Sequence, residues 1–275
     1  MPLPLHIVDV FAERPLAGNQ LAVIRGAAGL SDAQMQDIAR EMNFSETTFV
    51  LEEGQGRATV RIFTPEWELP FAGHPTLGTA WVLSGGEGEY VLDLPVGEVP
   101  VNFDDQGIGW IVPPDVKFGG GFARGADLLG LDEEVLHPDY PARLAEVGPR
   151  FVLIGVSTLD ALRAVRLNAE LRASLLDEGV GVQCVFAFTD EAYEPRADFA
   201  SRMFFESGGL REDAATGSAN TAFAAYLRDL HGGDREYVVD QGVEMNRPSR
   251  LYLNTGKPLL VGGRVFPSVE GQLNV

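Results

Sequence analysis

Short apolar segments with alternating polar positions recur along the whole chain and predict β-strands. Most are bounded by Gly or Pro, a pattern that favours antiparallel pairing over a doubly wound parallel sheet. The first half contains LHIVDVF, QLAVIR, TTFVLE, ATVRIFT, EYVLDLPV and GIGWIV. The second half contains RFVLIGV, VQCVFAF, FASRMFF, EYVVDQG and SRLYLN. Residues 260–275 are expected to return as strands to the first half.

Two helices are predicted at matching places in the two halves. The first follows Ser31, with Gln34 completing a capping box, and its apolar face is formed by Met35, Ile38 and Met42. The second follows the N-cap Asn168, and its apolar face is formed by Leu171, Leu175 and Leu176.

An internal repeat connects the halves. RIFTPEWELPFAGHPTLGTAW (61–81) aligns with RMFFESGGLREDAATGSANTAF (202–223), so that Arg61 and Phe63 match Arg202 and Phe204. The repeat predicts a duplicated α+β protein of two pseudo-symmetric lobes, with a ligand site in the cleft between them. The expected lobes are residues 1–115 with 260–275, and residues 116–259. The crossover is placed at Pro113-Pro114 and the glycines at 119–121, where GGGFARG reads as a flexible connection rather than a nucleotide site.

Composition narrows the function classes. A formal net charge of −19 disfavours nucleic acid and anionic membranes as partners. One cysteine excludes an internal disulfide and a two-thiol racemase, and the four histidines show no metal-binding spacing, so no metal is expected. No apolar run is long enough for a membrane helix, which predicts a cytoplasmic protein. An anionic substrate would therefore need a local binding site that favours negative charge.

Two predicted helix N-termini could form such a binding site. Gly73-His74-Pro75 is expected to open a helix through Ser84, with Pro75 at the first helical position and the N–H groups of Thr76 and Leu77 pointing out of its end. The second start is Asp213-Ala214-Ala215-Thr216-Gly217-Ser218, in which Thr216 aligns with His74. Gly217 allows close approach of a carboxylate, and Thr216 and Ser218 add hydroxyl groups.

Three titratable side chains are candidate acid–base groups, each with a structural alternative. His74 and Asp213 could instead serve only as helix caps, and Glu46 could be an exposed residue at the start of a strand. The sequence aligns Glu46 with Gln183, so a carboxylate is expected on one side only.

Several segments resemble the PhzF family of phenazine-biosynthesis-like proteins: NFSETTFV, AGHPTLGTAWVL, ADFASRMF, EDAATGSAN and QGVEMNRPS, with VFAERPLAGNQLAV and VGGRV near the ends. The resemblance implies a diaminopimelate epimerase-like fold, in which each lobe is a mostly antiparallel sheet wrapped around a central helix. It implies a homodimeric isomerase without cofactor, with Glu46 as general acid/base and His74 and Asp213 as flanking polar groups. It implies that the substrate is bound by Gly73, Thr216, Gly217, Ser218 and Asn19. Ala214 and Gln20 stand where the family usually has proline.

The leading hypothesis is therefore a cofactor-independent isomerase that moves a proton on a small cyclic or unsaturated amino or carboxylic acid. Three alternatives remain: a non-catalytic small-molecule binder or interaction protein, a one-base epimerase or dehydratase, and a hydrolase built from Ser218, His74 and Asp213. No GxSxG segment supports the hydrolase.

Overall fold

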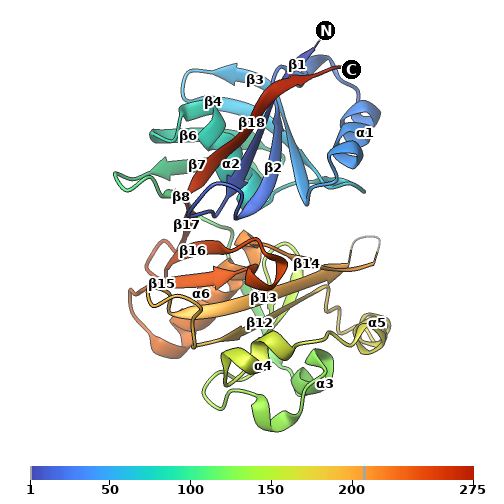
Figure 1. Ribbon diagram of the computed structural model, residues 1–275, viewed down its shortest axis with the longest axis vertical. Helices are drawn as coiled ribbons and strands as arrows, with labels where there is room; N and C mark the ends of the chain where they lie inside the picture. Colours follow the sequence, from blue (N-terminus) through green and yellow to red (C-terminus); the bar gives the residue numbers. More distant parts are fainter. Residues whose placement is uncertain (1, 207–208) are drawn as a thin grey trace. The chain divides into compact units, whose positions relative to one another are not determined.

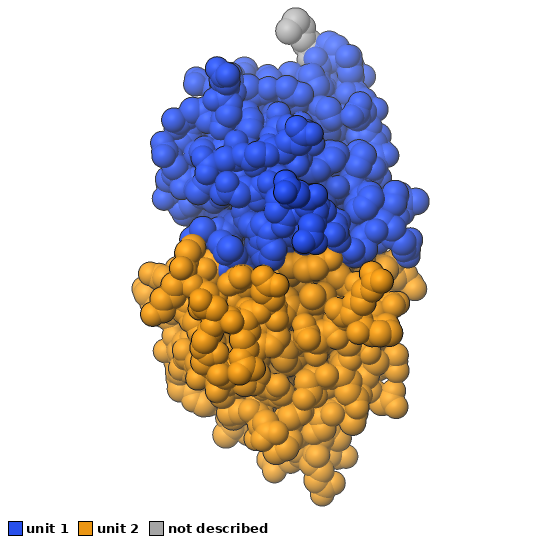
Figure 2. All heavy atoms as spheres, turned by 90° about the vertical axis from the view of Figure 1, so that its left-hand side faces the viewer, with its two compact units in different colours: residues 1–112, 260–275 blue, residues 113–259 orange. Residues whose placement is uncertain are grey.

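The computed structural model describes residues 2–206 and 209–275 and divides the chain into two compact units. Unit 1 comprises residues 1–112 and 260–275, and unit 2 comprises residues 113–259 (Figure 2). In the described part of the chain, no helix is both long and apolar enough to cross a membrane.

The strands of unit 1 form one curled sheet (Figure 1). Hydrogen bonds join its main strands in the order β18–β1–β2–β3–β4–β6–β7–β8–β17, parallel at β2–β3 and β4–β6 and antiparallel elsewhere. Because β17 continues into β18 through Arg264, the last strand returns the sheet to its beginning. The strands are β1 (Leu3–Val10), β2 (Asn19–Ile24), β3 (Glu46–Gly54), β4 (Arg57–Phe63), β5 (Glu68–Leu69), β6 (Gly88–Leu94), β7 (Gly97–Phe103), β8 (Gly109–Ile111), β17 (Leu260–Gly263) and β18 (Val265–Leu273).

Helix α2 (Gly73–Ser84) lies inside this sheet and touches β1, β2, β3, β6, β7, β8 and β18 (Figure 1). Every residue from His74 to Ala80 is buried, as expected for a helix with apolar or small residues on all sides. Gly78 permits the close packing, since a Cβ there would lie 2.7 Å from Val10 Cγ2. The shorter helix α1 (Asp32–Met42) covers the outside of β3 and β4, and its predicted capping box of Ser31 and Gln34 is confirmed.

Unit 2 repeats the arrangement with strands in the order β9–β10–β11–β12–β13–β15–β16, parallel at β11–β12 and β13–β15. Its long helix α6 (Gly217–His231) packs Phe223 against Phe186 and Phe188 of β12, with ring centroids 5.4 and 4.4 Å apart. The strands are β9 (Lys117–Gly121), β10 (Arg143–Glu146), β11 (Arg150–Gly155), β12 (Cys184–Thr189), β13 (Phe199–Glu206), β14 (Leu210–Asp213), β15 (Glu236–Gln241) and β16 (Ser249–Asn254). The remaining α-helices are α3 (Gly125–Leu129), α4 (Leu159–Ala164) and α5 (Ala169–Asp177), and single 3₁₀ turns span Ala27–Gly29, Glu133–Val135 and Val243–Met245.

The two units share one topology, which confirms the α+β duplication predicted from the repeat. The pairings β1–β2–β3–β4–β6–β7 and β10–β11–β12–β13–β15–β16 have the same sequence of antiparallel and parallel neighbours. An ion pair is duplicated with them. Arg61 of β4 binds both oxygens of Glu68 on β5, and Arg202 of β13 binds both oxygens of Glu212 on β14. Each pair ties a short strand to the strand beside it, immediately before the chain enters the long helix.

Three local expectations from the sequence are wrong. Pro75 is the third residue of α2 rather than the first, because the helix begins at Gly73. Leu176 is exposed, since the short helix α5 buries only Leu171 and Leu175 of its predicted apolar face. The glycines at 119–121 are not a flexible crossover, because they lie in strand β9, in which Gly121 pairs with Arg143 of β10.

Replacement of Arg202 by methionine should lower the free energy of unfolding by about 3–5 kcal/mol, because it leaves the carboxylate of Glu212 without its partner at a site where the Arg202 side chain is only 8% exposed. Arg57→Met, at an exposed arginine that pairs with Asp93, is the control and should change stability little. Urea unfolding of both variants measures the difference. If both variants lost the same free energy of unfolding, the buried Arg202–Glu212 pair would contribute no more to stability than the exposed Arg57–Asp93 pair.

Candidate active site

Glu46 and His74 approach each other in unit 1. Glu46 is the first residue of β3, where it pairs with Leu21, and His74 is the second residue of α2. His74 Nδ1 lies 3.3 Å from Glu46 Oε2, and the two side chains are 5% and 16% exposed. Glu46 is thus not an exposed residue at a strand end. The 3.3 Å contact with His74 is a close approach of the two groups and does not have hydrogen-bond geometry.

Burial governs the charge of His74. Loss of solvent lowers the pKa of the imidazole to about 3, and a backbone contact with Gln20 opposes this shift. Nε2 is buried and has no hydrogen-bond partner within residues 2–206 and 209–275. A charged ring would bury an unpaired N–H there, so the neutral form carries its proton on Nδ1, the nitrogen facing Glu46.

The free backbone N–H groups at the start of α2 are not those that the sequence predicts. The N–H of Thr76 donates to the carbonyl of Ala72 at 3.2 Å, and its hydroxyl donates to the same oxygen at 2.7 Å. Thr76 therefore offers no donor at the helix end. Because Ala72 provides no side-chain cap, the backbone N–H groups at Gly73 and His74 are the ones without an intrahelical acceptor.

Asp213 and Thr216 meet in unit 2, at the junction of β14 and α6. Asp213 is the last residue of β14, is 8% exposed and accepts a hydrogen bond from the Thr216 hydroxyl, with Oδ2 and Oγ1 2.5 Å apart. Thr216 is the N-cap of α6 by position, but its side chain does not cap the helix. The N–H groups of Gly217 and Ser218 consequently lack an intrahelical acceptor and leave a positive helix end.

The correspondence between the residues of the two units differs in one place from the sequence alignment. Glu46 corresponds to Cys184 rather than to Gln183, because Thr47 pairs with Phe63 as Val185 pairs with Phe204. Cys184 is buried, which together with the charge of Asp213 raises the pKa of its thiol to about 12.

Asn19 and Gln241 are two further buried polar residues at strand ends. Asn19, expected to bind substrate, is buried at the start of β2 opposite Val10. Gln241, at the end of β15, is fully buried and bonds to both Asp213 and Thr216. Sequence reasoning did not select Gln241, although it begins the segment QGVEMNRPS that contributed to the family resemblance.

A glycine beside Gln241 shapes the Asp213–Thr216 segment. Gly242 has φ +74°, and a Cβ there would lie 2.5 Å from the carbonyl oxygens of both Ala214 and Arg247. Gly242→Ala should therefore cost about 3 kcal/mol of stability, from left-handed strain plus displacement of this segment. Gly26→Ala is the matched control, since Gly26 has φ +69° with nothing within 4 Å, and should cost about 1 kcal/mol. Thermal unfolding compares the two variants. Equal losses of stability would mean that the segment containing Ala214 moves away from a Cβ at position 242 at little cost in free energy.

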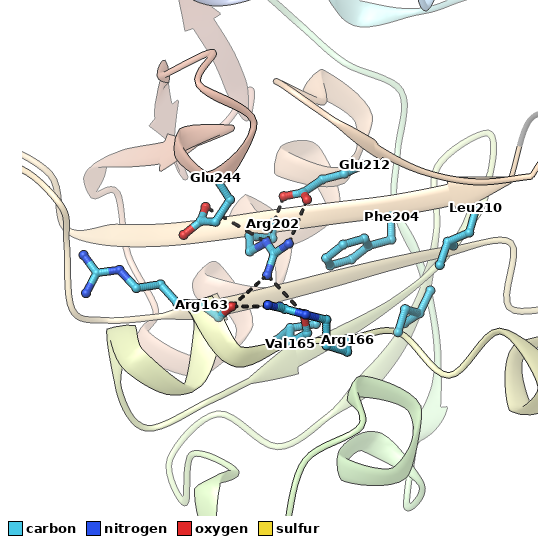
Figure 3. A pocket seen from close by; sticks show the side chains of 9 residues that line it. Arg163, Val165, Arg166, Arg202, Phe204, Leu210, Glu212 and Glu244 are labelled. Carbon is cyan, nitrogen blue, oxygen red and sulfur yellow. Dashed lines mark hydrogen bonds and ion pairs between the residues drawn. The ribbon is translucent and has the colours of Figure 1, made fainter.

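A separate groove of about 530 Å³ lies in unit 2 (Figure 3). Its arginines are occupied: Arg202 binds Glu212 and the carbonyls of Leu162, Arg163 and Val165, and Arg166 binds two of the same carbonyls. The Arg202 contacts hold the C-terminal end of α4 against β13. No predicted site residue lines the groove, which is formed by Arg163, Val165, Arg166, Leu167, Arg202, Phe204, Leu210, Glu212 and Glu244.

In the described ranges, no group of three or more His, Cys, Asp or Glu side chains is arranged to hold a metal ion.

The fold is that of the epimerase-like α+β proteins built from two matching units. A predicted epimerase of Pseudomonas aeruginosa has the same structure with a TM-score of 0.82 and 31% identity, covering 100% of both chains. A PhzF-family phenazine biosynthesis protein of Bacillus anthracis matches with a TM-score of 0.86 and 24% identity, again over 100% of both chains.

The chain belongs to the family of phenazine biosynthesis-like proteins, whose model (PhzC-PhzF) matches residues 8–263. The trans-2,3-dihydro-3-hydroxyanthranilate isomerase of Pseudomonas aeruginosa is 38% identical over 258 residues, covering 90% of this chain and 88% of that protein. The family predicted from the signature segments is thereby confirmed.

Proposed function

We propose that this chain, an isomerase of the phenazine biosynthesis-like family, moves a proton between two carbons of a small unsaturated cyclic amino or carboxylic acid. The observation that carries the proposal is the approach of the buried imidazole of His74 to the carboxyl group of Glu46, at 3.3 Å. Buried titratable pairs of this kind are characteristic of sites that transfer protons.

In the proposed mechanism Glu46 is the general base and then the general acid. Its carboxylate takes a proton from one carbon, the electron pair of the broken C–H bond enters the conjugated system, and the same carboxyl group returns the proton to another carbon. The neutral imidazole of His74 packs against the Glu46 carboxyl group on its Nδ1 side and adds no charge of its own.

In unit 2, the start of α6 is proposed to bind substrate as well. The N–H groups of Gly217 and Ser218 would receive the substrate carboxylate, because a helix start without a side-chain cap favours a negative charge. Asp213 would accept a hydrogen bond from the amine or hydroxyl of the substrate, and Thr216 would hold Asp213 in place. Asn19 and Gly73, both in unit 1, are proposed as further substrate-binding residues.

The substrate class rests on two arguments. Because the protein has a net charge of −19, an anionic substrate needs a local binding site of positive potential, and the start of α6 would provide one. The 38% identical relative is named for an unsaturated cyclic amino acid, trans-2,3-dihydro-3-hydroxyanthranilate. We extend the proposal to a reaction without metal or organic cofactor, in a cytoplasmic homodimer.

A solvent-exchange assay tests the function. The full chain is incubated in heavy water with trans-2,3-dihydro-3-hydroxyanthranilate and with a panel of related unsaturated cyclic amino and carboxylic acids. Isomerisation accompanied by deuterium at one carbon is the expected result. Saturable binding without exchange or turnover across the panel would instead favour a small-molecule binder.

The same assay distinguishes an epimerase and a dehydratase, and a labelling experiment tests the hydrolase. A one-base epimerase would exchange a single carbon-bound proton and invert its configuration, and a dehydratase would release water. A hydrolase built from Ser218, His74 and Asp213 would be labelled at Ser218 by a serine-directed covalent inhibitor. Absence of labelling would count against it.

A further inference from the structure

Gln241 lies at the centre of a buried hydrogen-bond network in unit 2. Its Nε2 donates to the carbonyl oxygen of Asp213 at 2.9 Å and to Thr216 Oγ1 at 3.1 Å. Its Oε1 accepts from the N–H of Thr216 at 3.3 Å and from Asn220 Nδ2 at 3.1 Å. The side chain thus bonds to both residues that flank the junction of β14 and α6.

Two backbone groups determine which way the Gln241 amide points. The carbonyl of Asp213 only accepts hydrogen bonds, so it requires the NH₂ group of Gln241. The N–H of Thr216 only donates, so it requires the oxygen. Asn220 is oriented in the same way, because its Nδ2 also donates to the Thr216 carbonyl at 3.0 Å.

The orientation of the amide decides the direction of the Thr216 hydroxyl bond. Thr216 Oγ1 receives a hydrogen from Gln241 Nε2, so its own hydrogen is available for Asp213 Oδ2, 2.5 Å away. A hydroxyl that donates to a carboxylate stabilises the ionised form of that group. With the amide reversed, the hydroxyl would donate to Gln241 instead.

We propose that Gln241 is a positioning residue that, through Thr216, holds the buried side chain of Asp213 as a hydrogen-bonded carboxylate. The catalytic meaning of this role rests on the proposed function, in which Asp213 accepts a hydrogen bond from the substrate. The physical role does not depend on it.

Two titratable side chains that neighbour Asp213 are Glu212 and Cys184. Glu212, its neighbour on β14, is bound by Arg202 at 2.8 Å. The Cys184 thiol on β12 interacts with Asp213, but burial raises its pKa to about 12, and it stays neutral while Asp213 titrates.

The test is a titration of Asp213 in the full-length protein by ¹³C NMR of labelled aspartate carboxyl groups, with the signal assigned by Asp213→Asn. Gln241→Met keeps the length of the side chain but removes the donor, and should raise the pKa of Asp213 by at least one unit, a tenfold change in its proton affinity. Thr216→Val should do the same. Thr216→Ser keeps the hydroxyl and should leave the titration at its wild-type position.

Gln241→Leu provides a second variant if Gln241→Met fails to fold, since its side chain also cannot donate to Thr216 and adds no charge beside Asp213. An unchanged Asp213 titration in a folded Gln241 variant, verified by thermal unfolding, would overturn the proposal. This readout does not involve turnover. Full isomerase activity of Asp213→Asn would contradict only the catalytic role of Asp213 and leave the network result standing.

Discussion

Glu46→Gln should lose isomerisation and solvent exchange together, by a factor of about 10²–10⁴, the usual contribution of a general acid/base. The substitution keeps the size of the side chain and its place at the start of β3, but an amide cannot accept a proton from carbon near neutral pH. Substrate turnover in heavy water, followed by mass spectrometry, measures both losses in one sample.

Glu52→Gln is the matched control for this variant, because Glu52 lies on the same strand and is exposed. It should retain wild-type turnover. If Glu46→Gln also exchanged protons at the wild-type rate, Glu46 would not be the base, and the role would pass to another side chain.

The second large effect is a pH dependence of stability caused by His74. In the folded protein burial lowers the pKa of His74 to about 3, whereas the unfolded chain binds the proton near the ordinary value of 6.5. The unfolded state therefore takes up the proton first, and stability is lost as the pH falls from 6.5 toward 3. At pH 4 the loss from this group amounts to about 3 kcal/mol.

Urea unfolding at pH 7 and at pH 4 measures this effect in wild type and in His74→Gln. The variant has no group that titrates at this position, so its loss of stability between the two pH values should be smaller than that of wild type by about 3 kcal/mol. His6→Gln, at a less buried imidazole, should behave like wild type. Identical pH dependence of wild type and His74→Gln would mean that His74 is already charged in the folded protein through its contact with Glu46.

Much of the fold could be predicted because its signals are local. Alternating apolar positions located the strands, and Ser31 with Gln34 located a helix start that the structure confirms. The internal repeat, in which Arg61 aligns with Arg202, predicted the duplication. The matching strand pairings confirm it. The glycines of β9 were misassigned, because their pairing with β10 depends on a distant segment of the chain.

The candidate site was predicted only in part. Glu46, His74 and Asp213 could be selected as titratable residues beside strand and helix ends, but nothing in the local pattern joins Glu46 to His74. Their 3.3 Å approach depends on α2 lying inside the sheet. Gln241 was missed because an amide at a strand end has no periodic signature, and its role exists only through contacts with residues 21 to 28 positions away.

The amino-acid sequence by itself determined the family, the α+β duplication and the positions of most strands and helices, since these follow from periodicity, capping and recurring motifs. The tertiary structure alone decided the partners and charge states of the buried groups. It neutralises His74, sets Cys184 at the position of Glu46, and gives Asp213 its hydroxyl donor. The physical reason is that hydrogen bonding and desolvation depend on distances between residues far apart in the chain, which no local pattern contains.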